Sequence, residues 1–278
     1  MTRLRAPGLL FLSAALASCT TIYNPATGRR ETVLDTSAEI ALGNIAKAQM
    51  GLFSLKMGRV DPAQHQRVQE IGGKLAQVSD RRDLRYQFGV VQDKSLNAFA
   101  LPGGTIYVHT GLLEKATDDE LAAVLGHEIG HVAARHSVKH LQADLGFTVL
   151  LQIASTAGVA PESARVAKSL YDLFSKGYSR QDELEADRLG IRYTSLAGRN
   201  PQAMVTFFQK MLEEKPEDPL SRALVWQRTH PLTSERIAKA KEEIARLKTP
   251  LFCPTCGRSY LDKKFCELDG TPLKEQKR

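Results

Sequence analysis

The sequence predicts an α+β fold that is mainly helical, contains a small sheet and ends in a small cysteine-containing appendage. Three observations predict it. Long segments carry apolar residues at helical spacing between clear start signals and stop signals. Short β-prone runs flank the turn sequence Pro102-Gly103-Gly104. Three of the four cysteines lie after residue 248. A length of 278 residues suits one large domain with such an appendage.

Residues 1–18 have the features of a bacterial signal peptide. Two arginines precede the apolar run Leu9–Leu16, which is much shorter than the ~20 residues of a membrane-spanning helix. The letters LASC at its end resemble a lipobox, the cleavage signal of bacterial lipoproteins. We therefore expect Cys19 to be lipidated and the protein to be membrane-anchored in the periplasm. The alternative is an ordinary signal peptide with an incidental cysteine.

Thr20 follows the expected lipidation site. In bacterial lipoproteins an aspartate at this position resembles an inner-membrane retention signal, so Thr20 favours the outer membrane.

The formal net charge of +7 does not indicate a nucleic-acid-binding protein. Two of these charges belong to the signal peptide and a surplus of three lies in residues 248–278, which leaves +2 for the body of the chain. A nucleic-acid groove would need clustered basic residues. We expect no nucleic-acid partner, and we interpret the basic C-terminal tail as solvated.

The remaining segments divide the chain into three parts. Residues 19–34 contain many turn formers and are expected to form a tether, 35–248 the main domain, and 249–278 the appendage with its basic tail. The expected helices cover 35–57, 62–78, a long helix from 117, 164–175, 179–197, 201–214 and 234–247, and the expected strands cover 86–91, 97–101 and 105–110. Residues 147–160 are apolar but too short to span a bilayer, which favours a buried helix or a flap over the site.

The strongest chemical signal is HEIGH at residues 127–131, an H-E-x-x-H motif. Residues four apart lie on one face of a helix, so His127 and His131 can bind one ion together. Glu128 then projects beside them toward a metal-bound water. By itself the motif leaves open whether it is a metal site or an incidental histidine pair on a core helix.

A second histidine pair, His136 and His140, follows on the same expected helix. In a continuous helix His136 lies about 180° from His127. No glutamate adjoins this pair, and Arg135 and Lys139 surround it. We interpret it as a solvated basic face rather than a metal site.

A catalytic zinc ion needs three protein ligands and one open position for water. The segment SRQDELEADRLG supplies a third ligand, because Glu183 and Asp187 lie four apart on one helix face. Glu183 is the candidate metal ligand, and Asp187 is the candidate acceptor for the free N–H of a ligating histidine. Glu185 is expected to point outward toward Arg188. The alternative is a surface helix with several ion pairs.

Small residues are expected to bring the two helices together. Gly126 and Gly130 lie four apart on the motif helix, and each destabilises a helix by ~1 kcal/mol relative to alanine. Ala186 and Gly190 are small and share the face of the candidate ligand, so this helix can pack closely on the two glycines. A capping box, formed by the threonine and glutamate at positions 117 and 120, marks the start of the motif helix.

Together these motifs resemble the gluzincin metallopeptidases of family forty-eight, the kin of HtpX and the CAAX prenyl proteases, and within them the BepA-like and LoiP-like periplasmic branch. The resemblance rests on HEIGH and ELEAD, with NPATGRR, EIALG, NAFALPGGTIYVHTGLL and THPLTSERIA in the same order. It covers about residues 24–248. It implies that His127, His131 and Glu183 hold zinc and that Glu128 is the general base.

The resemblance also implies roles for residues outside the two helices. His230 matches a histidine near the metal that steadies the oxyanion or occupies the open position of a latent form, although a plain turn residue is the alternative. Arg236 matches an arginine that stabilises the tetrahedral intermediate. Asn97, Ala98 and Phe99 lie in the expected edge strand, where an extended substrate forms backbone hydrogen bonds.

The C-terminal segment has its own metal-binding pattern. Cys253 and Cys256 form C-x-x-C-G, and Cys266 with Asp269 repeats it with aspartate in place of the fourth cysteine. The pattern resembles a zinc ribbon with a changed ligand, and such Cys₃Asp sites are less common than Cys₄ sites. The alternative is a disulfide, but lipidation of Cys19 leaves an odd number of cysteines, so one would stay unpaired.

The sequence thus predicts a lipid-anchored zinc metalloendopeptidase with a second, structural zinc ion. The resemblance alone implies extended polypeptide substrates from misfolded or stalled envelope proteins, and a partner in envelope assembly that binds the appendage. The alternative is a chaperone-like or latent binding protein that keeps the protease fold and uses the appendage for recognition.

Overall fold

The computed structural model describes residues 19–52, 61–146, 150, 169, 177–213, 225–247, 250–261 and 263–275. The expected signal peptide lies outside these residues, as do the apolar segment 147–160 and the helix at 164–175 apart from single positions. Across the described part of the chain, every helix is too short or too polar to cross a membrane.

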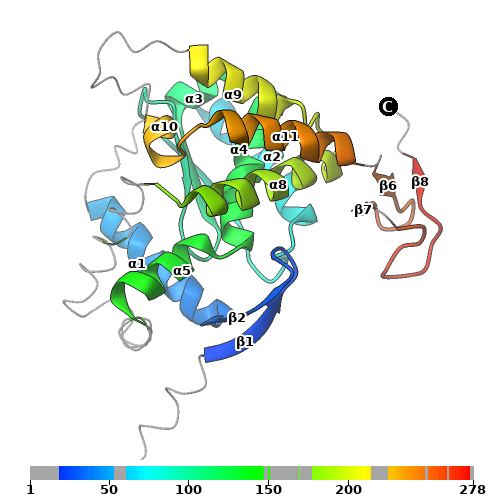
Figure 1. The fold of residues 1–278 in the computed structure, drawn as a ribbon, viewed down its shortest axis with the longest axis horizontal. Helices are drawn as coiled ribbons and strands as arrows, with labels where there is room; N and C mark the ends of the chain where they lie inside the picture. Colours follow the sequence, from blue (N-terminus) through cyan, green and yellow to red (C-terminus); the bar gives the residue numbers. More distant parts are fainter. Residues whose placement is uncertain are drawn as a thin grey trace, which may run out of the picture.

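Helices dominate the architecture, and the α+β class predicted from the sequence is confirmed (Figure 1). The elements are β1 Cys19–Asn24, β2 Arg29–Leu34, α1 Thr36–Leu52, α2 Pro62–Val78, β3 Gln87–Val91, β4 Ala98–Ala100, β5 Thr105–His109, α3 Thr110–Lys115, α4 Asp118–Ala133, α5 His136–Leu145, α8 Arg180–Leu196, α9 Ala203–Glu213, α10 Val225–Thr229, α11 Ser234–Arg246, β6 Leu251–Phe252, β7 Ser259–Tyr260 and β8 Lys274–Glu275.

Helix α4 is the central element of the domain, and every residue from Glu120 to Ala133 is buried. It packs against α8, α2, α9 and the strand β4. The predicted capping box is present: the Thr117 side chain accepts a hydrogen bond from the Glu120 N–H, and the Glu120 carboxylate accepts one from the Thr117 N–H. Burial on all sides explains why this helix is apolar around most of its circumference.

Helix α8 packs so closely on the two glycines of α4 that a larger residue would not fit, as the sequence predicts. A Cβ atom at Gly126 would lie 2.9 Å from the carbonyl oxygen of Gly190, and one at Gly130 would lie 2.8 Å from that of Ala186. The approach is mutual, because a Cβ at Gly190 would lie 2.7 Å from the backbone nitrogen of His127. The two helices therefore meet backbone to backbone beside the H-E-x-x-H motif.

The sheet of the main domain has the strand order β3-β5-β4, with β3 parallel and β4 antiparallel to β5. Strand β4 therefore lies at an edge, as expected. The turn before β5 needs glycine at two positions, because Gly103 and Gly104 have φ angles of 78° and 91°. Helix α4 packs against β4, which places the edge strand beside the H-E-x-x-H helix.

Residues 19–34 differ from the expected tether. They form an antiparallel hairpin in which β1 and β2 pair over their whole length. The side chain of Asn24 is buried and donates a 3.1 Å hydrogen bond to the carbonyl oxygen of Ala133 at the end of α4. The turn formers at 25–28 therefore close a hairpin that belongs to the folded domain.

Helix α4 ends abruptly, and α5 leaves in a new direction. Arg135 lies between them with a φ of 59°, a left-handed conformation that a residue other than glycine adopts only where other contacts hold it. Its guanidinium donates a 2.8 Å hydrogen bond to the carbonyl oxygen of Leu34 and pairs with the buried carboxylate of Glu39 at 2.9 Å. Arg81 pairs with the same carboxylate at 3.0 Å. These buried contacts hold the break that re-aims α5.

Candidate metal centre

Two helices supply the three ligands expected for a metal ion. Helix α4 contributes His127 and His131, whose Nε2 atoms lie 3.0 Å apart. Helix α8 contributes Glu183, whose carboxylate oxygens lie 3.6 Å from the Nε2 atom of His127 and 3.4 Å from that of His131. All three residues are at most 1% exposed. The structure therefore brings together the ligand set that the sequence predicts.

His230, which follows α10, completes a cluster of four ligand groups. Its Nδ1 atom lies 2.9 Å from Glu183 Oε1 and 3.2 Å from His127 Nε2. The ligand atoms of the four residues all lie within 4.8 Å of one another. In a zinc tetrahedron with bonds of ~2.0 Å, ligand atoms are ~3.3 Å apart. The donor set and its spacing therefore fit a four-coordinate zinc ion.

Glu128 lies beside this cluster and projects toward it. Its Oε1 atom is 3.5 Å from His230 Nε2, and neither oxygen has a hydrogen-bond partner of good geometry among the described residues. Burial raises the pKa of Glu128 to about 8, and the charge on His230 opposes this rise. The backbone of Ala100 also lowers the pKa in part. A buried carboxylate with so few partners is costly to keep unless it has a chemical role.

The ring of His127 is held by a partner on α8. Its Nδ1 atom lies 2.8 Å from Asp187 Oδ1, the contact expected from the sequence. Donation from this nitrogen leaves the Nε2 lone pair directed at the ligand cluster. Burial lowers the pKa of His127, which favours the neutral ring that binds metal.

Arg236, on α11, binds the carboxylates of both Glu183 and Asp187 on α8. Its Nε and Nη2 atoms each donate a 2.7 Å hydrogen bond to Asp187, and its Nη1 atom pairs with Glu183 at 2.6 Å. The guanidinium is 1% exposed and lies 4.8 Å from the ring centroid of Phe208. Burial opposes the charge on Arg236, but the two carboxylates outweigh it and raise the pKa of the guanidinium. The arginine thus fixes the candidate ligand Glu183, and it fixes Asp187, the partner of the candidate ligand His127.

His136 belongs to the site, and its interpretation as part of a solvated face is wrong. It is 1% exposed, and its Nδ1 atom lies 2.8 Å from the Nδ1 atom of His131. Its Nε2 atom lies 3.3 Å from carboxylate oxygens of both Asp182 and Glu185. Because the helix breaks at Arg135, the 180° rotation expected from a continuous helix does not apply.

The position of Glu185 follows from the same break. Instead of pointing outward toward Arg188, it reaches His136 and lies 3.8 Å from Arg29 of the β1–β2 hairpin. The Arg188 side chain donates instead to the carbonyl oxygen of Ala26.

Aromatic rings cover the site, and sequence reasoning did not find them. Tyr178 stacks on His131 with ring centroids 3.9 Å apart, and its hydroxyl lies 2.7 Å from the Ser137 hydroxyl. Trp226 stacks on His230 with centroids 4.1 Å apart. Both rings come from segments without a recognisable motif. They close the ligand cluster in this conformation.

The expected substrate strand lies at the sheet edge but is covered here. Asn97, Ala98 and Phe99 are all at most 8% exposed. The backbone N–H of Trp226 donates a 3.1 Å hydrogen bond to the carbonyl oxygen of Leu96, so α10 lies at the start of this strand. The same short helix therefore carries the ring that stacks on His230 and contacts the edge-strand segment.

Four residues of the C-terminal appendage also come together as the sequence predicts. Ligand atoms of Cys253, Cys256, Cys266 and Asp269 lie within 4.8 Å of one another, and the three cysteines are free thiols.

Comparison with known proteins agrees with this geometry. The family model of peptidase family M48 matches residues 62–244. The chain is 28% identical over 248 residues to the beta-barrel assembly-enhancing protease of Escherichia coli (strain K12), covering 83% of this chain and 50% of the relative. It is 30% identical over 225 residues to the mitochondrial metalloendopeptidase OMA1 of Schizosaccharomyces pombe, covering 79% and 65%.

A third relative is the metalloprotease LoiP of Escherichia coli (strain K12), 32% identical over 163 residues, which is 57% of this chain and 62% of LoiP. The chain spans about half the length of the beta-barrel assembly-enhancing protease that it matches. The family model covers more than half of the chain and contains the two helices that carry His127, His131 and Glu183. The chain therefore belongs to peptidase family M48.

Proposed function

We propose that this chain hydrolyses peptide bonds with one zinc ion held by His127, His131 and Glu183. The observation that carries the proposal is the convergence of these three ligand atoms, with the buried carboxylate of Glu128 beside them. A bound zinc ion supplies an acidified water and polarises the scissile carbonyl. No other described cluster combines two neutral histidines, a glutamate ligand and a free base.

In this proposal the residues around the ion transfer the proton and hold the ligands in position. Glu128 takes a proton from the attacking water and passes it to the leaving amine. Asp187 and His136 fix the ring orientations of the two ligating histidines. We assign Arg236 to positioning rather than to the oxyanion, because Glu183 and Asp187 already engage its nitrogens.

His230 has a separate role in this proposal. Its Nδ1 atom takes the fourth corner of the ligand cluster, where a catalytic zinc keeps its open position. Trp226 stacks on its ring and binds the backbone before the edge strand. We propose that this is a latent conformation, and that α10 with His230 moves away when substrate binds.

The substrates we propose are extended polypeptides that lie along β4, with Asn97, Ala98 and Phe99 offering backbone groups at the sheet edge. The names of two relatives, a beta-barrel assembly-enhancing protease and the metalloprotease LoiP, favour misfolded or stalled envelope proteins as their source. A lipid anchor at Cys19 would hold the enzyme at the periplasmic face of the outer membrane, and the appendage would bind an envelope-assembly partner.

A chaperone-like protein that binds polypeptides without cutting them is the second candidate, and the closed site favours it. Digestion of casein by the purified chain, with and without a zinc chelator, separates the two. We expect cleavage that the chelator abolishes. We also expect Glu128→Gln to abolish cleavage while zinc content stays unchanged, because this residue is not a ligand. Cleavage by the Glu128→Gln variant would remove Glu128 as the base, and an absence of cleavage under all conditions would favour the chaperone.

A further inference from the structure

We infer that the C-terminal appendage holds a structural metal ion, best fitted by zinc, with Cys253, Cys256, Cys266 and Asp269 as its four ligands. This site is separate from the catalytic centre and does not depend on the proposed reaction. Its evidence is the backbone geometry of the two ligand-bearing turns, the spacing of the ligand atoms and the small size of the appendage's core.

The two ligand-bearing turns have the same backbone structure. In the first, the Gly257 N–H donates to the Cys253 carbonyl at 2.8 Å; in the second, the Gly270 N–H donates to the Cys266 carbonyl at 2.9 Å. Both glycines adopt a left-handed conformation, with φ angles of 70° and 69°. The N–H groups of both leading cysteines also donate at 2.8 Å to the carbonyl five residues on. Asp269 therefore occupies the turn position that Cys256 occupies in the first turn.

The ligand atoms lie at the distances expected for the edges of a zinc tetrahedron. The Sγ atoms of Cys256 and Cys266 are 3.6 Å apart. Zinc–sulfur bonds of ~2.3 Å place two ligand sulfurs ~3.8 Å apart. The carboxylate oxygens of Asp269 lie 3.8 Å and 3.9 Å from the Sγ atom of Cys253, near the ~3.5 Å expected for a sulfur and an oxygen on one ion. The aspartate thus faces the three sulfurs as a fourth ligand would.

Further contacts support thiolate sulfurs at this point. The Cys256 N–H donates to the Cys253 sulfur at 3.4 Å, and the Tyr260 hydroxyl lies 3.3 Å from the Cys266 sulfur. Donors directed at ligand sulfurs are typical of metal sites, because they stabilise negative charge on the thiolate. All four positions of the ion are filled, so we assign this ion a structural role.

The appendage needs such an ion because its own core is very small. Its three strands have two residues each, and its buried apolar cluster consists of Cys253, Tyr260 and Cys266, with Leu273 packed against it. A unit of this size rarely folds without a metal ion or a disulfide. Ion binding would supply the folding free energy that the core lacks.

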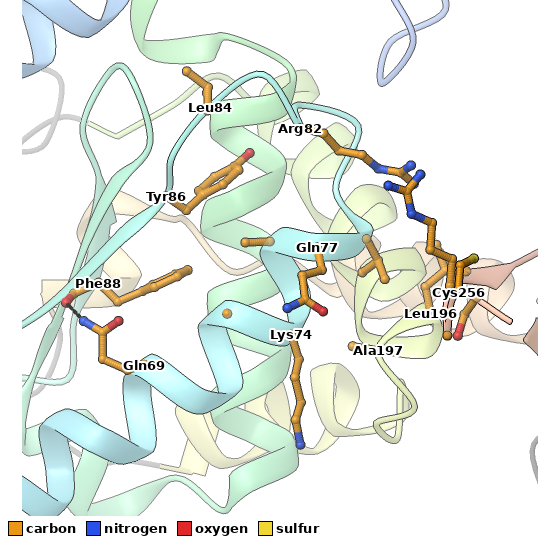
Figure 2. Close-up of a pocket in the computed structure, with 16 residues that line it drawn as sticks. Gln69, Lys74, Gln77, Arg82, Leu84, Tyr86, Phe88, Leu196, Ala197 and Cys256 are labelled. Atoms are coloured by element: carbon orange, nitrogen blue, oxygen red, sulfur yellow. Dashed lines mark hydrogen bonds between the residues drawn. The ribbon is translucent and has the colours of Figure 1, made fainter. Parts of the chain in front are cut away.

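The first ligand-bearing turn also faces the protease domain across a cavity. Cys256 and Arg258 line a cavity of about 660 Å³, and Arg82, Leu196 and Lys74 line its other walls (Figure 2). In Figure 2 the Arg82 side chain extends from the loop after α2 toward Cys256. The first ligand turn therefore forms one wall of this cavity.

Metal analysis of the full chain tests the inference. We expect about two zinc ions per chain for the wild type, one for each cluster of ligands. Cys253→Ser and Cys266→Ser should each reduce the content to about one, as should His131→Ala at the catalytic centre. Exchange of zinc for cobalt then identifies the site: cobalt should show a sulfur-to-metal charge-transfer band that persists in His131→Ala and disappears in Cys253→Ser.

Matched variants in the second turn test the unusual ligand. Asp269→Cys should keep the ion and strengthen the charge-transfer band, because a fourth sulfur binds cobalt. Asp269→Ala should weaken metal retention against a chelator. Glu267→Gln is the control, because this neighbouring carboxylate pairs with Lys263 and is 60% exposed. It should leave both the zinc content and the band unchanged.

Two results would overturn the inference. One is a wild-type zinc content of about one, with no charge-transfer band after cobalt exchange. The other is a peptide map of the unreduced chain that shows a disulfide between two of the three appendage cysteines, since it would then occupy two of the four ligand positions.

Discussion

At the scale of single residues, the Nδ1 atoms of His127 and His131 determine how the two candidate ligand rings are oriented. In each ring the Nε2 atom belongs to the ligand cluster, and the Nδ1 atom contacts a second residue. The Nδ1 atom of His127 donates to Asp187, and that of His131 donates to the Nδ1 atom of His136. His136 can accept that proton only if its own proton is on Nε2, where Asp182 and Glu185 are the acceptors. One arrangement of protons therefore satisfies these ring nitrogens and leaves the Nε2 lone pairs of His127 and His131 directed at the ligand cluster.

This arrangement predicts that His136 sets metal affinity without touching the metal. His136→Ala removes the acceptor for His131, and we expect zinc affinity to fall about 10- to 100-fold. Competition with a chromogenic chelator measures it. His136→Gln keeps an acceptor and should recover part of the affinity. His140→Ala is the matched control, because His140 also contacts Asp182 but not a ligand. Equal affinities for His136→Ala and the wild type would contradict the role.

Arg236 gives a second prediction, which distinguishes positioning from oxyanion stabilisation. Lysine keeps the charge but cannot bind Asp187 through two nitrogens while also reaching Glu183. We expect Arg236→Lys to lower zinc affinity and kcat together, each by about 10-fold or more. The measurements are chelator competition and casein cleavage at saturating zinc. A loss of kcat with unchanged zinc affinity would instead assign Arg236 to the transition state.

The same residues show how far sequence reasoning reaches at this scale. Glu183 and Asp187 could be predicted because spacing within one helix fixes which side chains share a face. His136 could not, because its position depends on a break in the chain that no proline or glycine marks. Ala134 and Arg135 are ordinary helical residues, and buried contacts with Leu34 and Glu39 make the break.

At the scale of elements, the contact between α4 and α8 holds the two halves of the metal site in register. It also gives a third prediction. Alanine at Gly130 would favour the helix by ~1 kcal/mol but would place Cβ 2.8 Å from the Ala186 carbonyl oxygen. The atom in the way belongs to the backbone of α8, which can move only if the two helices separate. We therefore expect a net loss of about 1–3 kcal/mol in the free energy of unfolding. Urea denaturation measures it.

The control for this variant lies on α2. Gly73 is also within a helix, but a Cβ there would meet no atom within 4 Å. Gly73→Ala should therefore stabilise the protein by up to ~1 kcal/mol, through helix propensity alone. If both alanine variants stabilised the protein, close packing at Gly130 would be excluded as the reason for its glycine.

Elements with a strong local signal could be predicted from the sequence, and those held by distant contacts could not. Helix α2 begins after Asp61 with proline in its first turn, and α4 begins at a capping box, so their starts are encoded locally. The β1–β2 hairpin contains many turn formers and is short, and its place in the fold depends on Asn24 reaching the end of α4. No pattern within residues 19–34 encodes that contact.

At the scale of the whole molecule, the closed site is built from three parts of the chain. The three candidate ligands come from α4 and α8, and Tyr178 comes from the segment before α8. Trp226 lies in α10, and His230 is the residue after it. Closure is therefore a property of the assembled fold, which is why sequence reasoning left the role of His230 open.

The closed arrangement leads to a prediction for His230. If this residue holds the fourth ligand position in a latent state, only the fraction of molecules with α10 displaced can bind substrate, and the apparent affinity falls by that fraction. His230→Ala removes the closing ligand but leaves His127, His131 and Glu183, so zinc should be retained. We expect casein cleavage to rise by about 10-fold, which corresponds to a closing free energy of ~1.4 kcal/mol.

The double variant with Glu128→Gln should be inactive, which shows that the added activity uses the same site. Trp226→Ala, which removes the ring that stacks on His230, should raise cleavage in the same direction while the imidazole remains. A fall in kcat for His230→Ala with an unchanged or higher rate for Trp226→Ala would instead show that His230 acts on the oxyanion once α10 has opened. Both single variants together therefore separate closing the site from stabilising the transition state.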